Sequence, residues 1–308
     1  MSRCHLFCYL ACITLFALYT VYSSFVCNLS EVDRDEIDLQ TVLVRGNKTK
    51  VFEKWRKCAE RNWLRIKSPA AFWANFESGS EKCDWESDAV EELGIVTTRN
   101  KDDTKHFILP KDNATETTFI TLGIGKDIAA ELNYERKMKK LGKLVTFYGA
   151  DPISTWNEDL YSTLGRYFPF AVGMKSGTST ASVLIDKKYV SKTVEYKDVL
   201  SFIKQDLNIE RIDNLWIDAE FAEYEMFPIF EKDGLLDKNN IVVCQVNLEI
   251  HLNQFFNLDQ NPEFQKKFMQ FVVKTVEDGK YGILRATDAH HMRIFMFNFD
   301  SDYCRKRF

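Results

Sequence analysis

The pattern that decides the fold lies in residues 119–151, FITLGIGKDIAAELNYERKMKKLGKLVTFYGAD. It is typical of a strand, a glycine turn, a helix, a second strand and an acid, in this order: 119–122, 123–125, 127–141, 144–148 and Asp151. Glycine lets the backbone approach a ligand closely, because it has no Cβ and accepts positive φ. The free N–H groups that begin the helix would face such a ligand, and an acid at the tip of the next strand can accept hydrogen bonds from ribose hydroxyls. The stretch therefore predicts a nucleotide pocket with Gly123, Gly125 and Asp151 as binding residues.

The glycine turn alone is a weak signal, because the third glycine of the dinucleotide-binding fingerprint is missing. Asp127 stands near that position and is predicted to cap the helix. The helix pattern supports the unit, since Ile128, Leu132 and Met138 form an apolar stripe. A βαβ unit whose glycine turn binds no ligand stays open as the alternative.

Composition indicates a globular chain without a nucleic-acid partner. Of 308 residues, 45% are hydrophobic and 28% are charged, which is enough for one large α/β domain or two small ones. The net charge is −4, and the basic run Arg305-Lys306-Arg307 is short. Nucleic-acid binding is therefore not favoured.

An uncharged apolar stretch at 6–26 is long enough to cross a bilayer. Arg3 precedes it and acidic residues follow it, so the positive-inside rule places the N-terminus in the cytosol and the rest of the chain in the lumen. We expect a single-pass type II membrane protein of the endoplasmic reticulum or Golgi, with a signal anchor at 1–27 and a lumenal stem at 28–47. A cleaved signal peptide, which would give a secreted protein, is the alternative.

Sequons and cysteines fit a chain that enters the secretory pathway. Three Asn-x-Ser/Thr triplets outside the predicted core elements predict a glycoprotein: Asn28, Asn47 and Asn113. In an oxidising lumen Cys58 and Cys83 are expected to form a disulfide. Cys244 stands inside an apolar strand and is expected to be a buried free thiol.

The body of the chain divides into a helical cap and an α/β region. Residues 48–118 are expected to be helical, with a break at the glycine and charge cluster 78–84 and a short hairpin within 97–118. From 119 to 308 strands alternate with helices, which predicts a doubly wound, mostly parallel α/β sheet. Besides the elements above, the predicted strands are 167–173, 181–185, 193–196, 214–218, 241–246, 283–287 and 294–299, and the predicted helices are 158–164, 198–206, 222–230 and 262–277. The last two strands are expected to close the sheet as an antiparallel pair.

Polar residues follow two of these apolar strands. In a doubly wound sheet ligands bind beyond the carboxyl ends of the strands, so the polar residues are expected to line one cleft. Asp218 and Glu220 can hold a substrate hydroxyl, a proton or a metal. His251, with Glu249 on the same strand face, is a candidate general base. A capping acid and a buried histidine satisfied by backbone are the structural alternatives.

Two further features are weaker. Glu223, one helical turn beyond Glu220, could face the cleft or form a salt bridge. The adjacent pair His290-His291 is poorly spaced for joint metal binding and is expected to be loop. No Cys/His cluster has zinc spacing, and no metal is assigned.

Together these motifs resemble the FkbM-type methyltransferase domain, a Rossmann-like class I S-adenosylmethionine-dependent fold. The resemblance covers about residues 119–299 and is carried by five blocks: Thr121-Leu122-Gly123-Ile124-Gly125, Tyr148-Gly149-Ala150-Asp151-Pro152, Ala171-Val172-Gly173, Leu215-Trp216-Ile217-Asp218-Ala219-Glu220-Phe221-Ala222-Glu223 and Asn247-Leu248-Glu249-Ile250-His251. The fourth block is similar to the family's Asp-x-Glu-Gly-x-Glu, with Phe221 in place of the glycine.

The resemblance implies methyl transfer from S-adenosyl-L-methionine to a hydroxyl of a small-molecule or glycan acceptor. Gly123 and Gly125 would lie along the methionine part of the cofactor, and Asp151 would hold the ribose. The catalytic residues facing the acceptor would be Asp218, Glu220 and His251.

Two other functions stay open. A Golgi-type glycosyltransferase fits the anchor, stem and lumenal domain, and Asp218-Ala219-Glu220 resembles a metal-binding Asp-x-Asp motif. A non-catalytic lumenal or secreted binding protein on a degenerate methyltransferase scaffold fits the altered glycine turn and Phe221.

Overall fold

The computed structural model describes residues 47–185, 188–252, 261–289 and 291–308. The predicted membrane segment and the stem lie outside these ranges, apart from Asn47. Within the described ranges, no helix has the length and apolar character needed to cross a bilayer.

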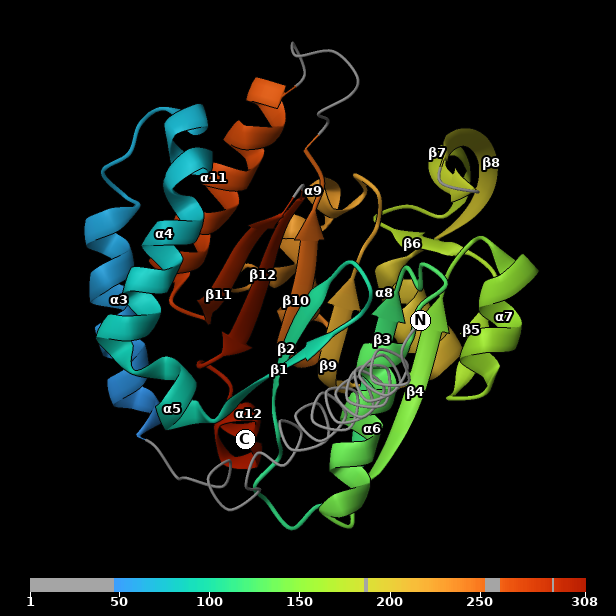
Figure 1. Cartoon of the computed structure of the whole chain (residues 1–308), viewed down its shortest axis with the longest axis horizontal. Coiled ribbons are helices and arrows are strands. Elements are labelled where there is room, and N and C mark those ends of the chain that lie inside the picture. Colours follow the sequence, from blue (N-terminus) through green and yellow to red (C-terminus); the bar gives the residue numbers. More distant parts are fainter. Residues whose placement is uncertain (1–46, 186–187, 253–260, 290) are drawn as a thin grey trace, which may run out of the picture. The chain divides into compact units, whose positions relative to one another are not determined.

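A seven-stranded sheet forms the centre of the fold, in the order β11-β12-β10-β9-β3-β4-β5 (Figure 1). Its strands are β3 (Glu116–Leu122), β4 (Leu144–Ala150), β5 (Arg166–Phe168), β9 (Arg211–Ile217), β10 (Val242–Ile250), β11 (Tyr281–Ala289) and β12 (His291–Asn298). All neighbouring pairs from β10 to β5 are parallel, whereas β12 runs antiparallel between β10 and β11. The chain winds outward from β3 to β5 and then returns to the other side of β3. This confirms the doubly wound, mostly parallel sheet with an antiparallel last strand.

One face of the sheet is covered by α6 (Ala129–Lys140), α7 (Ser154–Ser162) and the hairpin of β1 (Ile95–Arg99) and β2 (Thr104–Ile108). Phe119 of β3 packs against Tyr134 of α6, with ring centroids 5.0 Å apart. The hairpin is fixed by two buried amides of β10: Gln245 pairs with the backbone of Ile108, and Asn247 pairs with that of His106. The predicted hairpin is thus present, and it lies against the sheet rather than apart from it.

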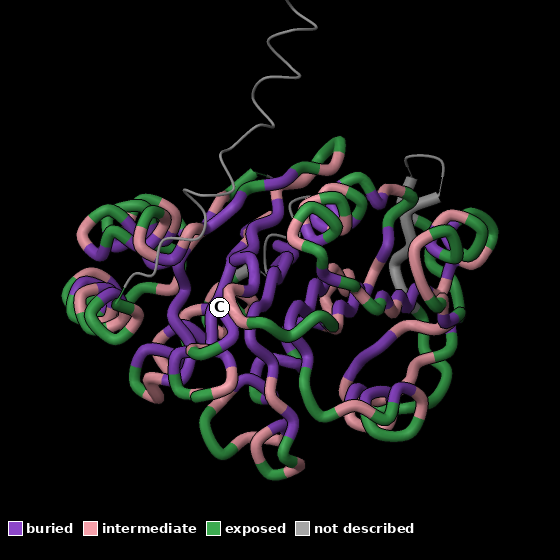
Figure 2. Tube along the Cα trace, turned by 90° about the horizontal axis from the view of Figure 1, so that it is seen from below, coloured by how far each residue is buried: buried purple, intermediate pink, exposed green. Residues whose placement is uncertain are grey.

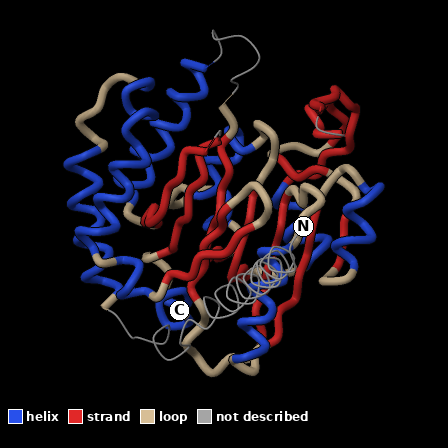
Figure 3. The backbone as a smooth tube through the Cα atoms, in the orientation of Figure 1, coloured by secondary structure: helices blue, strands red, loops and turns tan. Residues whose placement is uncertain are grey.

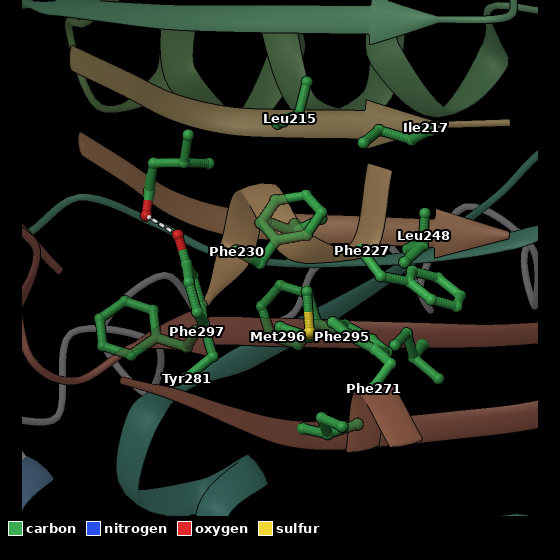
Figure 4. Close-up of a cluster of buried hydrophobic side chains, with 14 of the residues drawn as sticks. Leu215, Ile217, Phe227, Phe230, Leu248, Phe271, Tyr281, Phe295, Met296 and Phe297 are labelled. Carbon is green, nitrogen blue, oxygen red and sulfur yellow. Dashed lines mark hydrogen bonds between the residues drawn. The ribbon is translucent and has the colours of Figure 1, made fainter. Parts of the chain in front are cut away.

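The opposite face is an apolar core around the aromatic residues of η2 (Phe227–Phe230) and α11 (Asn261–Asp278), as Figure 4 shows. Phe227 stacks on Phe271, with ring centroids 4.3 Å apart. Helix 222–230 was predicted as one piece, but it divides into α9 (Glu223–Met226) and the 3₁₀ turn η2. Pro228 is the physical reason, because it has no N–H to donate within a helix.

Three N-terminal helices extend this core: α3 (Lys48–Asn62), α4 (Pro69–Ser87) and α5 (Ala89–Leu93). Helices α3 and α4 lie with α11 beside β11, and α5 lies against α3 and β1 (Figure 3). The Trp55 indole donates to the carbonyl of Ile283 at 2.7 Å, and one hydrophobic cluster runs from these helices into the sheet. The predicted disulfide between Cys58 and Cys83 joins α3 to α4. Buried segments lie in the middle of the molecule, while the outer sides of the helices are exposed (Figure 2).

The predicted helix break at 78–84 is wrong. Helix α4 runs through these residues, and the chain breaks earlier, where Ser68 caps α4 and Pro69 begins it. Gly79 is a packing residue, because a Cβ there would lie 2.6 Å from the Trp63 indole nitrogen. The glycine therefore lets the chain after α3 approach α4 closely.

Two other predicted elements are divided. Strand 167–173 is split at Pro169 into β5 and β6 (Ala171–Gly173), and β6 joins a three-stranded sheet with β7 (Gly177–Ile185) and β8 (Lys188–Asp198). Helix 198–206 is a short turn, α8 (Val199–Ser201), followed by the π-helix η1 (Phe202–Leu207). A further short helix, α10 (Leu235–Lys238), precedes β10.

The expectation of a free thiol at Cys244 is wrong, because Cys244 forms a disulfide with Cys304. Helix α12 (Asp302–Arg307) returns the end of the chain to the sheet, where Arg307 lies 2.5 Å from Asp213. Cys244 and Cys304 are 60 residues apart in the sequence, and the return of α12 to the sheet brings them together. No local sequence pattern predicts this return.

Replacing both Cys244 and Cys304 with serine is expected to lower the free energy of unfolding by about 4 kcal/mol, because the disulfide closes a long loop in the unfolded chain. Denaturant unfolding of the two proteins measures the difference. Peptide mapping without reduction should recover the Cys244–Cys304 cross-link, and an alkylated Cys244 in the native protein would contradict the pairing.

Candidate active site

The site lies where the winding of the sheet reverses, at the carboxyl ends of β3 and β9. Gly123 donates to the carbonyl of Ala150 at 2.9 Å, and Asp218 donates to that of Leu122 at 2.8 Å. Gly123 has φ +85°, and a Cβ on it would lie 1.9 Å from the carbonyl oxygen of Asp218. Only glycine fits this position, so the glycine brings the tips of the two strands together.

The glycine turn continues through Gly125 and Lys126, which have φ of +63° and +65°. Asp127 closes the turn by donating to the carbonyl of Ile124 at 3.3 Å. A Cβ on Gly125 would meet nothing within 4 Å, so this side of the turn borders open space. The two glycines therefore differ: Gly123 is required by packing, and Gly125 relieves the backbone of a conformation that side chains rarely adopt.

Asp151 lies directly beside this turn, as predicted. Its Oδ2 accepts from the amide of Ile124 at 2.9 Å, and its Oδ1 accepts from that of Ile153 at 2.7 Å. The residue is buried. Each carboxylate oxygen can accept a second hydrogen bond, so capacity for a ligand hydroxyl remains.

The start of α6 differs from the expectation. The helix begins at Ala129, whose amide donates to Asp127 Oδ1 at 2.9 Å, so Asp127 stands just before the cap position. The next amide, that of Ala130, donates to Asn100 Oδ1 from the hairpin at 2.8 Å. The expectation that free amides of this helix face a ligand is therefore wrong for these two groups.

Four residues form an acid–histidine cluster: Asp218 and Glu220, which follow β9, Glu223, which begins α9, and His251, which follows β10. Glu223 Oε1 accepts from the His251 amide at 2.8 Å and lies 3.1 Å from the ring Nδ1. The other ring nitrogen, Nε2, lies 3.4 Å from Asp218 Oδ1 and 3.6 Å from Glu220 Oε2. His251 and Glu223 are buried, whereas about a third of each of the Asp218 and Glu220 side chains is exposed. The cluster thus joins the core to the solvent side of the site.

The backbone that carries this cluster is strained. Glu220 and Phe221 are consecutive residues with φ of +45° and +78°. Phe221 occupies the position at which the motif it resembles has glycine, and side chains rarely adopt this region. Its ring lies 5.5 Å from those of His251 and Phe264, centroid to centroid. Packing against these rings offsets strain that costs on the order of 1–3 kcal/mol per residue.

Burial favours the neutral form of Asp218, whereas the nearby carboxylates favour the charged form of His251. Desolvation raises the pKa of Asp218 to about 6, against the lowering effect of His251 and Lys105, although part of the side chain reaches solvent. Desolvation opposes the charged form of His251, but the charges of Glu223, Asp218 and Glu220 outweigh it and raise its pKa to about 10. At neutral pH the imidazolium is therefore the cation that the three carboxylates surround.

Glu249 does not act as the carboxylate partner of His251. It accepts hydrogen bonds from Arg293 at 2.8 and 3.1 Å. Arg293 also lies 2.8 Å from Asp103 of the hairpin, which pairs with the buried Lys105. Asp103, Lys105 and Arg293 could not be predicted as part of the site, because no local pattern shows that the hairpin packs onto β10.

His291 was expected in a loop, but it is the first residue of β12, and its ring centroid is 4.4 Å from that of His251. The sequence does not distinguish a polar residue that begins a strand from one in the preceding loop. His290 lies outside the described residues.

Beneath the glycine turn, a buried acid of α6 supports β3. Thr121 donates to Glu131 Oε1 at 3.1 Å, and the Tyr161 hydroxyl donates to Thr121 at 3.1 Å. Desolvation raises the pKa of Glu131 to about 7, although hydrogen bonds and Lys105 lower it. The neutral carboxyl is thus the form that this site favours.

We expect the stability of the protein to fall between about pH 4.5 and pH 7 because of Glu131. Its folded pKa is above its unfolded value, so its contribution is present at low pH and is lost as pH rises through about 7. Glu131→Gln stays neutral. Thermal melts at pH 5 and pH 8 should show the variant gaining up to about 3 kcal/mol over wild type at the higher pH. A difference that does not change with pH would contradict this.

Comparison with known proteins agrees with this geometry. The family model for the Methyltransferase FkbM domain matches residues 64–303, most of the chain. Searches of curated proteins and of solved structures returned no match. The match extends the sequence resemblance upstream from residue 119 to residue 64, just after α3, and so includes α4, α5 and the β1–β2 hairpin. The strand order and the matched residues together make this chain a member of the FkbM methyltransferase domain family.

Proposed function

We propose that the chain is an S-adenosylmethionine-dependent O-methyltransferase that acts on a hydroxyl of the sugar or glycan class in the secretory pathway. Family membership makes it a methyltransferase at family level and implies a methyl donor such as S-adenosylmethionine. The observation that carries the proposal is the meeting of three groups at one sheet edge. Asp151 accepts a hydrogen bond from the amide of Ile124 in the glycine turn, and Gly123 of that turn lies against the backbone of Asp218. The Asp218 side chain faces His251.

The residues fit the cofactor in two respects. Gly125 borders open space, which leaves room for the methionine part beside the turn. Asp151 retains one acceptor position on each oxygen, so it can accept from ribose hydroxyls while it holds the turn. Bound there, S-adenosylmethionine supplies an electrophilic methyl group.

The chain's own residues would position the acceptor and take its proton. The base must be reachable from the acceptor, and Asp218 is partly exposed. A pKa of about 6 leaves Asp218 ionised and able to accept a proton at neutral pH. His251 is buried, and its pKa is raised to about 10, so it is already protonated. We therefore assign the base role to Asp218 and an orienting role to His251.

A binding protein on this scaffold is the second candidate. It is favoured by the amides of Ile124, Ala129 and Ala130, which donate to protein side chains. The strained Phe221, which stands where the motif has glycine, also favours a binding protein. The glycosyltransferase alternative is disfavoured by the family to which the chain belongs.

Calorimetric titration with S-adenosylmethionine tests the cofactor site. Wild type is expected to bind. Asp151→Ala should weaken binding about 10- to 100-fold, because a hydrogen bond to a charged group contributes about 1.5–3 kcal/mol. Asp159→Ala is the matched control, since Asp159 is exposed on α7. Thermal melts establish that each protein is folded. A folded wild type that gives no binding heat would contradict the proposal and favour a binding protein.

Passage through the secretory pathway is supported by the disulfides Cys58–Cys83 and Cys244–Cys304, since structural disulfides persist in oxidising compartments. Asn113 lies exposed in the turn before β3 and is open to glycosylation.

Protein expressed in animal cells should therefore lose mass on treatment with an endoglycosidase, and Asn113→Gln should remove one glycan. Mass spectrometry of the Asn113 peptide measures occupancy. An unmodified Asn113 on a chain that carries no glycan would contradict a lumenal location.

A further inference from the structure

Three side-chain atoms of the acid–histidine cluster have the arrangement of metal ligands. Asp218 Oδ1, Glu220 Oε2 and one His251 ring nitrogen lie within 4.8 Å of one another. The Nε2 atom is 3.4 and 3.6 Å from the two oxygens. Neighbouring ligands of an octahedral ion with bonds near 2.1 Å lie about 3 Å apart. Small movements of the two partly exposed carboxylates would close that difference.

His251 is held as metal-binding histidines are. Its Nδ1 lies 3.1 Å from Glu223 Oε1, and that oxygen also accepts the His251 amide. His251 is 2% exposed and Glu223 is 0% exposed, so the ring orientation is fixed within the core. A carboxylate on one ring nitrogen, with the other directed at the ion, is the usual outer-shell arrangement of such sites.

The two carboxylate oxygens lack other partners. Asp218 Oδ1 and Glu220 Oε2 are both buried atoms, and neither accepts a hydrogen bond from the described residues. Buried acceptors of this kind are rarely left without a donor or an ion. Their other oxygens belong to side chains about a third exposed, so further coordination positions would face the solvent side.

The charges around the cluster also leave room for a cation. Asp103 and Glu249 lie beside the three carboxylates of the cluster, and the permanent cations among them are Lys105 and Arg293. Both cations are engaged by Asp103, and Arg293 is engaged by Glu249 as well. This leaves Asp218, Glu220 and Glu223 around the imidazole of His251.

A second set of potential ligands shares His251 and includes Glu249 and His291. Glu249 accepts two hydrogen bonds from the Arg293 fork, so binding an ion there requires breaking an ion pair. The Asp218 and Glu220 oxygens require no such loss, and the first set is therefore favoured.

We propose that Asp218, Glu220 and His251 bind one divalent cation of the Mn²⁺ class, with Glu223 as the positioning residue behind His251. Two carboxylates and one imidazole are a ligand set for Mn²⁺ or a similar ion rather than for a thiolate-bound metal. The ion displaces the proton on His251 Nε2. Its solvent-side positions suit oxygen atoms of a hydroxyl ligand. The site does not depend on the proposed methyl transfer, so its test needs no methyl donor.

The test is titration of the purified, chelator-treated full-length chain with Mn²⁺. Binding is measured as the loss of the electron paramagnetic resonance signal of free Mn²⁺. One ion per chain is expected. Asp218→Asn, which preserves shape, should weaken binding by roughly 100-fold or more, and Glu223→Gln by about 10- to 100-fold. Glu225→Gln is the matched control, because Glu225 is exposed on the same helix. Glu249→Gln should also retain binding.

Thermal melts give an independent readout. Saturating Mn²⁺ should raise the melting temperature of wild type and of Glu225→Gln, but not that of Asp218→Asn. The proposal is overturned if folded wild type shows no saturable binding, or if Asp218→Asn binds as well as wild type. Loss of binding in Glu249→Gln with retention in Asp218→Asn would also overturn it, because the ion would then belong to the second set.

Discussion

The contact between Gly123 and the carbonyl of Asp218 is the constraint on which the site depends. Without a side chain at Gly123, the ends of β3 and β9 can lie together at the point where the sheet reverses. The same turn brings its next amide, that of Ile124, to Asp151 at the tip of β4. One glycine thus links three strand ends, and any Cβ there would separate the Asp151 side of the site from the acid–histidine cluster.

The second constraint is electrostatic. The acid–histidine cluster holds several carboxylates within a few ångströms, which is stable only if a cation lies among them. Without a bound ion, the imidazolium of His251 is this cation, and the surrounding carboxylates raise the pKa of His251. Burial raises the pKa of Asp218. The strained backbone at Glu220 and Phe221 brings both acids of this segment near the ring. Strain at this place, rather than elsewhere in the sheet, is consistent with a functional site.

Sequence patterns predicted the features that arise locally. The apolar strands and the glycine turn predict the parallel sheet, and the rule that ligands bind at the carboxyl ends of strands predicts that Gly123, Asp151, Asp218 and His251 lie at one edge. Features that depend on distant packing could not be predicted in this way. The partner of Cys244 lies on a helix at the end of the chain, and Gly79 is explained by Trp63 rather than by a helix break. The pairing of Lys105 with Asp103 and of Arg293 with Glu249 is likewise visible only in three dimensions.

Asp151 shows how far the geometry constrains a cofactor. Its two oxygens already accept from the amides of Ile124 and Ile153, so under the proposed function a ribose would share these oxygens rather than replace the amides. Sharing is favourable, because the existing hydrogen bonds fix the carboxylate and little orientation entropy is lost on binding. Replacement would leave two buried amides without acceptors, at about 1–3 kcal/mol each. The physical expectation is therefore a preorganised acid that accepts from backbone and ligand together.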